Sequence, residues 1–121
     1  MPHIIIEGKK IIFELIYGYF IKTVERNDKY IIKFEDSFLN QSKDLILIKT
    51  TVIENNNNHQ KYYIQLMKKE NQITVRLDPI TDPLNKTFGV KTSLARVAKM
   101  IFSIHKDFDL SITKTNLEDF I

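Results

Sequence analysis

The residue with the most specific possible chemistry is Pro2, which lies in the Met-Pro-His start of the chain, residues 1–3. Methionine is readily removed when proline follows it, which would leave Pro2 with a free secondary amine. An α-amino group titrates at about pH 8, so a prolyl amine can act as a base near neutral pH if its pKa is lowered. Desolvation by the apolar residues 4–6 and a nearby cation would both lower it. Pro2 is therefore a candidate base, although proline after methionine is common and often has no role.

The common catalytic and nucleotide-binding motifs are absent from the sequence. It has no Gly-x-Gly-x-x-Gly, P-loop, Gly-x-Ser-x-Gly or His-Glu-x-x-His pattern, and only three glycines are available for a phosphate-binding loop. Because the chain has no cysteine, disulfides, thiolate catalysis and cysteine-based zinc sites are excluded. The three histidines lack metal-ligand spacing. We therefore predict neither a metal nor a cofactor.

The remaining chemically active side chains have simpler interpretations. His105 falls on the apolar side of a predicted helix, which favours a buried structural role. His59 is expected to lie in the Asn-rich loop and to be solvated. Tyr62 and Tyr63 could stack on bases, but neighbouring residues of a strand face opposite sides, so we expect one in the core and one on the surface.

Strands are the main elements that must position these residues. A short buried strand is predicted over residues 3–7, and the strongest strand of the chain over residues 45–53. A final strand is predicted over residues 110–113. Residues 62–67 and 72–77 alternate in polarity on either side of a turn, which predicts a hairpin.

The connections are less regular. Residues 36–43 and 55–58 are predicted to be loops, and the prolines within 78–83 should take the chain out of the sheet. Residues 11–26 fit two interpretations equally well. Their apolar side chains have the spacing of an amphipathic helix, but they also alternate as a strand that could pair with residues 30–34 across a turn at 26–29.

One helix is predicted over residues 92–106, with Thr92 or Ser93 as its cap. Its apolar stripe predicts packing against the sheet; it consists of Leu94, Val97, Ala98, Ile101, Phe102 and His105. The basic residues off this stripe should be solvated; they are Lys91, Arg96, Lys99 and Lys106.

Length and composition set the class of protein. A chain of 121 residues fits one domain, residues 1–121, and its apolar and charged fractions of 43% and 27% are those of globular proteins. We predict an α+β fold, with an antiparallel-rich or mixed sheet and a C-terminal amphipathic helix packed on one face. The absence of cysteine, of a leader-like start and of a long apolar run favours a cytoplasmic protein with no membrane contact.

The net charge of +3 is too small for a dedicated nucleic-acid binder. Lysine also outnumbers arginine, whereas arginine is the usual reader of bases and phosphates. The sequence therefore argues against nucleic acid as the main partner.

The opening Pro2-His3-Ile4-Ile5-Ile6-Glu7 resembles that of 5-carboxymethyl-2-hydroxymuconate isomerases, members of the tautomerase superfamily. Chain length, the C-terminal helix and the last strand are also similar. The resemblance implies a homo-oligomer, a trimer in that family, which moves a proton α to a carbonyl with the N-terminal proline as base and without a cofactor. Lys43 or Arg76 would then hold the carboxylate of a small substrate. The family usually has an arginine near the position of Lys43, and it has a helix directly after its first strand.

Two other functions stay open. The first is a non-catalytic protein-interaction or assembly module that uses a strand edge or the basic helix face. The second is weak nucleic-acid binding through the helix cations. The state of residues 11–26 bears on the choice, because a helix there fits the β-α-β plan of the tautomerases and a hairpin makes the chain a meander.

Overall fold

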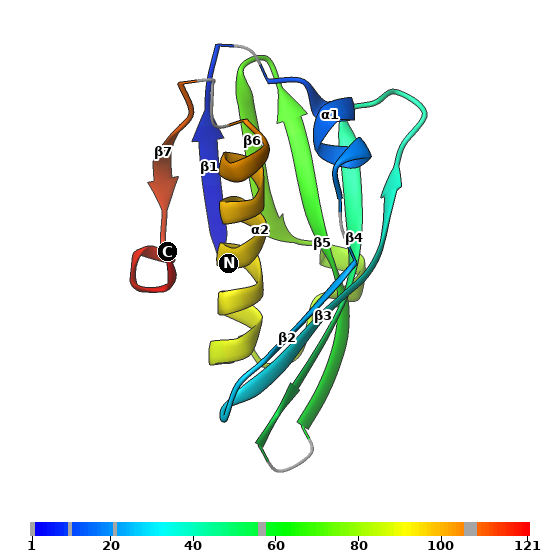
Figure 1. The fold of residues 1–121 in the computed structure, drawn as a ribbon, viewed down its shortest axis with the longest axis vertical. Coiled ribbons are helices and arrows are strands. Elements are labelled where there is room, and N and C mark those ends of the chain that lie inside the picture. Colours follow the sequence, from blue (N-terminus) through cyan, green and yellow to red (C-terminus); the bar gives the residue numbers. More distant parts are fainter. Residues whose placement is uncertain (1, 10, 21, 56–57, 106–108) are drawn as a thin grey trace.

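The structure is a computed structural model that describes residues 2–9, 11–20, 22–55, 58–105 and 109–121. The described part of the chain forms one antiparallel sheet of seven strands, with a long helix packed across one face (Figure 1). The predicted α+β class, with an antiparallel-rich sheet and a C-terminal helix on one face, is confirmed.

The strands follow one another along the chain as β1 (His3–Glu7), β2 (Thr23–Arg26), β3 (Tyr30–Leu39), β4 (Leu45–Glu54), β5 (Asn58–Lys69), β6 (Gln72–Leu77) and β7 (Ser111–Thr115). Across the sheet their order is β2-β3-β4-β5-β6-β1-β7. The strands predicted within residues 3–7, 45–53 and 110–113 and the hairpin of residues 62–77 are confirmed. Strand β1 lies between β6 and β7, so both ends of the chain meet at one side of the sheet (Figure 1).

Residues 11–26 contain both elements that the pattern allowed. A short helix, α1 (Phe13–Gly18), buries Phe13 and Ile16 against the core. Strand β2 then pairs with β3 as an antiparallel hairpin. The turn between them is closed by Asn27, whose Oδ1 accepts hydrogen bonds from the backbone N–H groups of Lys29 and Tyr30.

The loop predicted for residues 36–43 is wrong in its first half. Strand β3 continues to Leu39 after a bulge, which adds one residue to β3 between Phe34 and Asp36 relative to β4. Pairing with β4 outweighs the low strand propensity of this polar stretch. The turn is confined to residues 40–44, where Asn40 Oδ1 accepts from the N–H groups of Asp44 and Leu45.

The long helix α2 (Phe88–Ile104) begins one turn earlier than predicted. Thr87 is its N-cap, and the side-chain oxygen accepts a hydrogen bond from Val90 N–H at 3.4 Å. The predicted caps, Thr92 and Ser93, are buried within the helix. Lys106, at the predicted C-terminal end, lies outside the described residues.

Strand β4 also stabilises the start of α2. The Glu54 carboxylate accepts hydrogen bonds from the Thr87 hydroxyl and from Gly89 N–H. A negative charge here satisfies backbone donors of the first turn and complements the helix dipole. The start of α2 is thereby fixed over β4.

The core lies between the sheet and the two helices. Leu94, Val97, Ala98 and Ile101 of α2 are buried, which confirms the structural stripe. They pack with an isoleucine-rich sheet face, of which the most buried members are Ile4, Ile6, Ile32, Ile46, Ile48, Ile64 and Ile73. In the described part of the chain, neither α1 nor α2 covers the opposite face of the sheet, so a groove between a helix and the sheet must lie on the α2 side (Figure 1).

Candidate functional site: a groove beside the long helix

Pro2 and Arg76 lie near the same end of β1, but their side chains face opposite sides of the sheet. Pro2 is buried directly before β1. Arg76 pairs in register with His3, the next residue. Because side chains alternate along a strand, Arg76 and His3 share the face away from α2, whereas buried Ile4 faces the core. Arg76 Nε donates to Gln65 Oε1 at 2.6 Å on that outer face.

Lys43 lies far from both of these residues. It is an exposed residue of the β3–β4 turn, with a positive φ of 60° and an ion pair to Glu14 at 3.8 Å. The register of the intervening strands places nearby Leu45 level with Ile5, so Lys43 lies three strands away from β1 and toward the end of β1 opposite Pro2. The structure therefore does not gather Pro2, Lys43 and Arg76 into one site.

The basic face of α2 is not uniformly solvated, and the prediction for Arg96 is wrong. Arg96 Nε donates to Glu25 Oε1 at 2.7 Å, an ion pair between α2 and strand β2. Arg96 Nη2 lies 3.4 Å from the Tyr30 hydroxyl, which itself donates to Glu25 Oε2 at 2.7 Å. Lys91 Nζ sits 5.9 Å from the centre of the Phe120 ring. Of the three cations of this helix face that the structure describes, Lys99 alone is exposed, as predicted.

The three groups of this cluster shift one another's protonation in a consistent way. The Arg96 guanidinium, with smaller effects from Tyr30 and Lys99, holds the pKa of Glu25 below its ordinary value. The hydrogen bond to Glu25 raises the pKa of Arg96, and burial raises that of Tyr30. Near neutral pH the cluster therefore contains an ionised carboxylate, a guanidinium and a neutral phenol.

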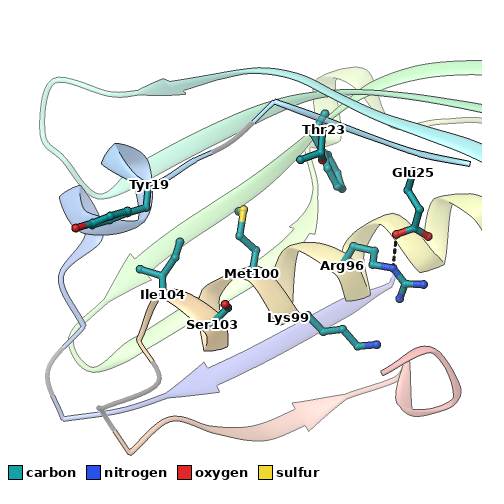
Figure 2. Close-up of a pocket in the computed structure, with 9 residues that line it drawn as sticks. Tyr19, Thr23, Glu25, Arg96, Lys99, Met100, Ser103 and Ile104 are labelled. Carbon is teal, nitrogen blue, oxygen red and sulfur yellow. Dashed lines mark hydrogen bonds and ion pairs between the residues drawn. The ribbon is translucent and has the colours of Figure 1, made fainter.

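A groove runs beside this cluster, between the C-terminal half of α2 and the β2–β3 hairpin (Figure 2). Its volume is about 580 Å³. The apolar part of its lining comes from Tyr19, Phe34, Met100 and Ile104, which lie on α2, on β3 and just after α1.

Polar groups occupy the rest of the lining. Thr23 and Ser103 place hydroxyl groups on it, and Glu25, Arg96 and Lys99 lie together toward one end (Figure 2). The groove is thus apolar along most of its length and charged at one end. Such a combination, an apolar cleft with a few convergent polar groups, is typical of sites for small ligands.

The histidines and tyrosines have structural roles or are exposed. His105 is buried at the C-terminal end of α2, as predicted, and its Nε2 accepts a hydrogen bond from Ile12 N–H at 3.4 Å. Tyr62 is buried and bonds with Ser93 Oγ, whereas Tyr63 is partly exposed, which confirms the prediction of opposite faces. His59 is exposed, but it lies in β5 rather than in a loop.

The described residues contain no cluster of histidine and carboxylate side chains that could hold a metal ion. None of the helices described is long and apolar enough to cross a bilayer.

Sequence reasoning missed the groove because its members come from distant segments. Glu25 and Arg96 are 71 positions apart, and helical spacing alone identified Arg96 only as part of a basic face. One usable signal was present: Met100 and Ile104 are apolar residues outside the predicted stripe of the helix, so they could have indicated a second apolar surface.

No protein-family model, curated protein or solved structure matches this chain.

Proposed function

We propose that this domain is a non-catalytic binding module and that the groove between α2 and the β2–β3 hairpin holds a small, elongated apolar molecule. One observation carries the proposal: Phe34, Met100 and Ile104 line an open hollow of about 580 Å³ instead of closing it. That volume falls within the roughly 300–1,000 Å³ of typical ligand sites. Covering these side chains with a ligand would remove apolar surface from water, which favours binding.

The polar groups of the groove fit binding better than catalysis. Arg96 keeps the pKa of Glu25 low, so this carboxylate is a poor general base near neutral pH. Ser103 has no histidine beside it in the described lining that could activate its hydroxyl. The groove therefore supplies recognition groups rather than a proton-transfer pair.

The test is a titration with Nile red, an uncharged dye whose fluorescence rises in apolar surroundings. We expect saturable binding to the wild type. Met100→Trp should weaken that binding about tenfold or more, because the larger side chain fills the groove. The matched control is Met67→Trp, since Met67 is an exposed methionine in β5, outside the groove lining.

Circular dichroism and thermal unfolding should first show that both variants are folded. Equal dye affinity in the wild type and both variants would place the apolar site elsewhere and refute the proposal. The proposal would also be refuted if the folded wild type did not bind the dye.

Proton transfer by Pro2, in the manner of the tautomerases, stays a separate prediction with its own test. Intact mass shows whether Met1 is retained, and a retained Met1 would rule out a free prolyl amine. If Met1 is removed, the prediction requires an enol–keto conversion that is lost in Pro2→Ala. An unchanged rate in that variant would exclude the mechanism.

A further inference from the structure

The two ends of the groove differ in chemistry. At one end lie Tyr19 and Ile104, with no charged group in the described lining there (Figure 2). At the other end lie Glu25, Arg96 and Lys99 (Figure 2). A ligand that fits both ends must itself be amphipathic, with an apolar tail and a polar head.

The charges at the polar end favour an anionic head. The Glu25 carboxylate is neutralised by its 2.7 Å ion pair with Arg96. Lys99 lies one helical turn beyond Arg96, is exposed, and makes no ion pair within the described chain. One carboxylate therefore faces two cations, which leaves a net positive charge for an incoming anion.

Arg96 is already held in position for a second partner. Its Nε is fixed by Glu25 and its Nη2 by Tyr30, and both contacts hold the planar guanidinium in place. A guanidinium has five N–H donors, so donors remain for a ligand oxygen. Preorganisation of this kind reduces the entropic cost of binding.

We infer that the ligand is an amphiphile with a single carboxylate head, which binds between Lys99 and Arg96 while its apolar tail lies toward Tyr19 and Ile104. This inference rests on the proposed binding function and specifies its ligand class. Charge-assisted hydrogen bonds from two cations set the orientation, and the apolar walls provide most of the contact area.

The test compares three probes with the same tail, namely decanoate, decanol and decylammonium, with the two ions below their critical micelle concentrations and decanol below its solubility limit. Their binding is measured by calorimetry and by displacement of Nile red. We expect decanoate to bind about tenfold more tightly than decanol, the effect of one or two charged hydrogen bonds. The preference should shrink at high salt, because the head group is open to solvent. Acetate, the head without the tail, should not displace the dye.

Lys99→Gln should bring the ratio of decanoate to decanol affinity close to one. The matched control is Lys91→Gln, which removes a cation of the same helix outside the groove lining and should keep the ratio. Equal binding of decanol and decanoate by the wild type, or a preference for decylammonium, would overturn the carboxylate inference while leaving the apolar site intact. If Nile red itself failed to bind, the proposed function would fail together with the inference.

Discussion

Arg96 links the fold to the groove. Its ion pair with Glu25 joins α2 to the edge strand β2, and about a third of each side chain is exposed, 31% and 36%. Solvent screens such a pair, so its contribution to stability is modest. Its main effect is positional, because it places a guanidinium at the charged end of the groove.

His105 gives a prediction at the same scale. Burial lowers its pKa, so the folded state favours the neutral imidazole that accepts the hydrogen bond from Ile12 N–H. At pH values between the pKa of His105 in the folded state and its unfolded value of about 6.5, the unfolded chain binds more protons than the folded chain. The free energy of unfolding should therefore fall as pH drops through about 6.5, until the folded pKa is passed.

The measurement is urea unfolding at several pH values from about 8 to about 5. His105→Gln should lose this part of the pH dependence, whereas His59→Gln should retain it, because His59 is exposed. The same pH slope in wild type and His105→Gln would show that other groups cause it.

At the scale of elements, the start of α2 depends on a close approach to β4. A Cβ added at Gly89 would lie only 2.7 Å from Val52 Cγ1 and 3.0 Å from Glu54 Cδ. Val52 is buried and β-branched, so it has little freedom to move away. Glycine is therefore required by packing, although it is a poor helix former.

Gly89→Ala should consequently destabilise the protein, by roughly 1–3 kcal/mol for overpacking, less the gain of about 1 kcal/mol from helix propensity. Gly18→Ala is the matched control, because a Cβ there meets no heavy atom within 4 Å. It should be neutral or stabilising. Chemical unfolding of both variants measures the difference, and a gain in stability for Gly89→Ala would contradict the packing argument.

The helices and strands also show how much of the fold could be predicted from local sequence patterns. Periodicity found β4, the β5–β6 hairpin and the apolar stripe of α2, because burial on one face imposes a regular spacing. It misplaced the start of α2, because the contacts of Thr87 and Gly89 with Glu54 that fix this end involve a strand distant in the sequence. It could not resolve residues 11–26 or extend β3, because pairing between strands decided both. The groove depends on the same long-range pairing between strands, so the spacing of residues along the sequence could not predict it.

For the whole molecule, the sheet order ties the two ends of the chain together. Strand β1 lies between β6 and β7, and His3 N–H donates to Asn116 Oδ1 at 3.0 Å. The groove lies on the α2 side near the other edge, where β2 is the last strand. None of the residues that line the groove belongs to β1 or β7, the strands that carry the two ends of the chain.

Charge at this scale leads to the last prediction, that the protein does not bind nucleic acid near physiological salt. The net charge is only +3, and Arg96 is already paired with Glu25. Lys91 lies over an aromatic ring, and Lys99 is the one exposed cation left on α2 among the residues described. So few free cations on α2 release few counterions from a polyanion, which leaves its affinity for nucleic acid weak. Fluorescence polarisation with mixed single- and double-stranded oligonucleotides, at about 50 and about 150 mM salt, should show no sub-micromolar binding at the higher value. The contrary result would be sub-micromolar binding at that salt that is abolished when Lys91→Glu and Lys99→Glu are combined. It would make the basic face of α2 a nucleic-acid site. The main role of Lys99 would then not be the binding of small carboxylates in the groove.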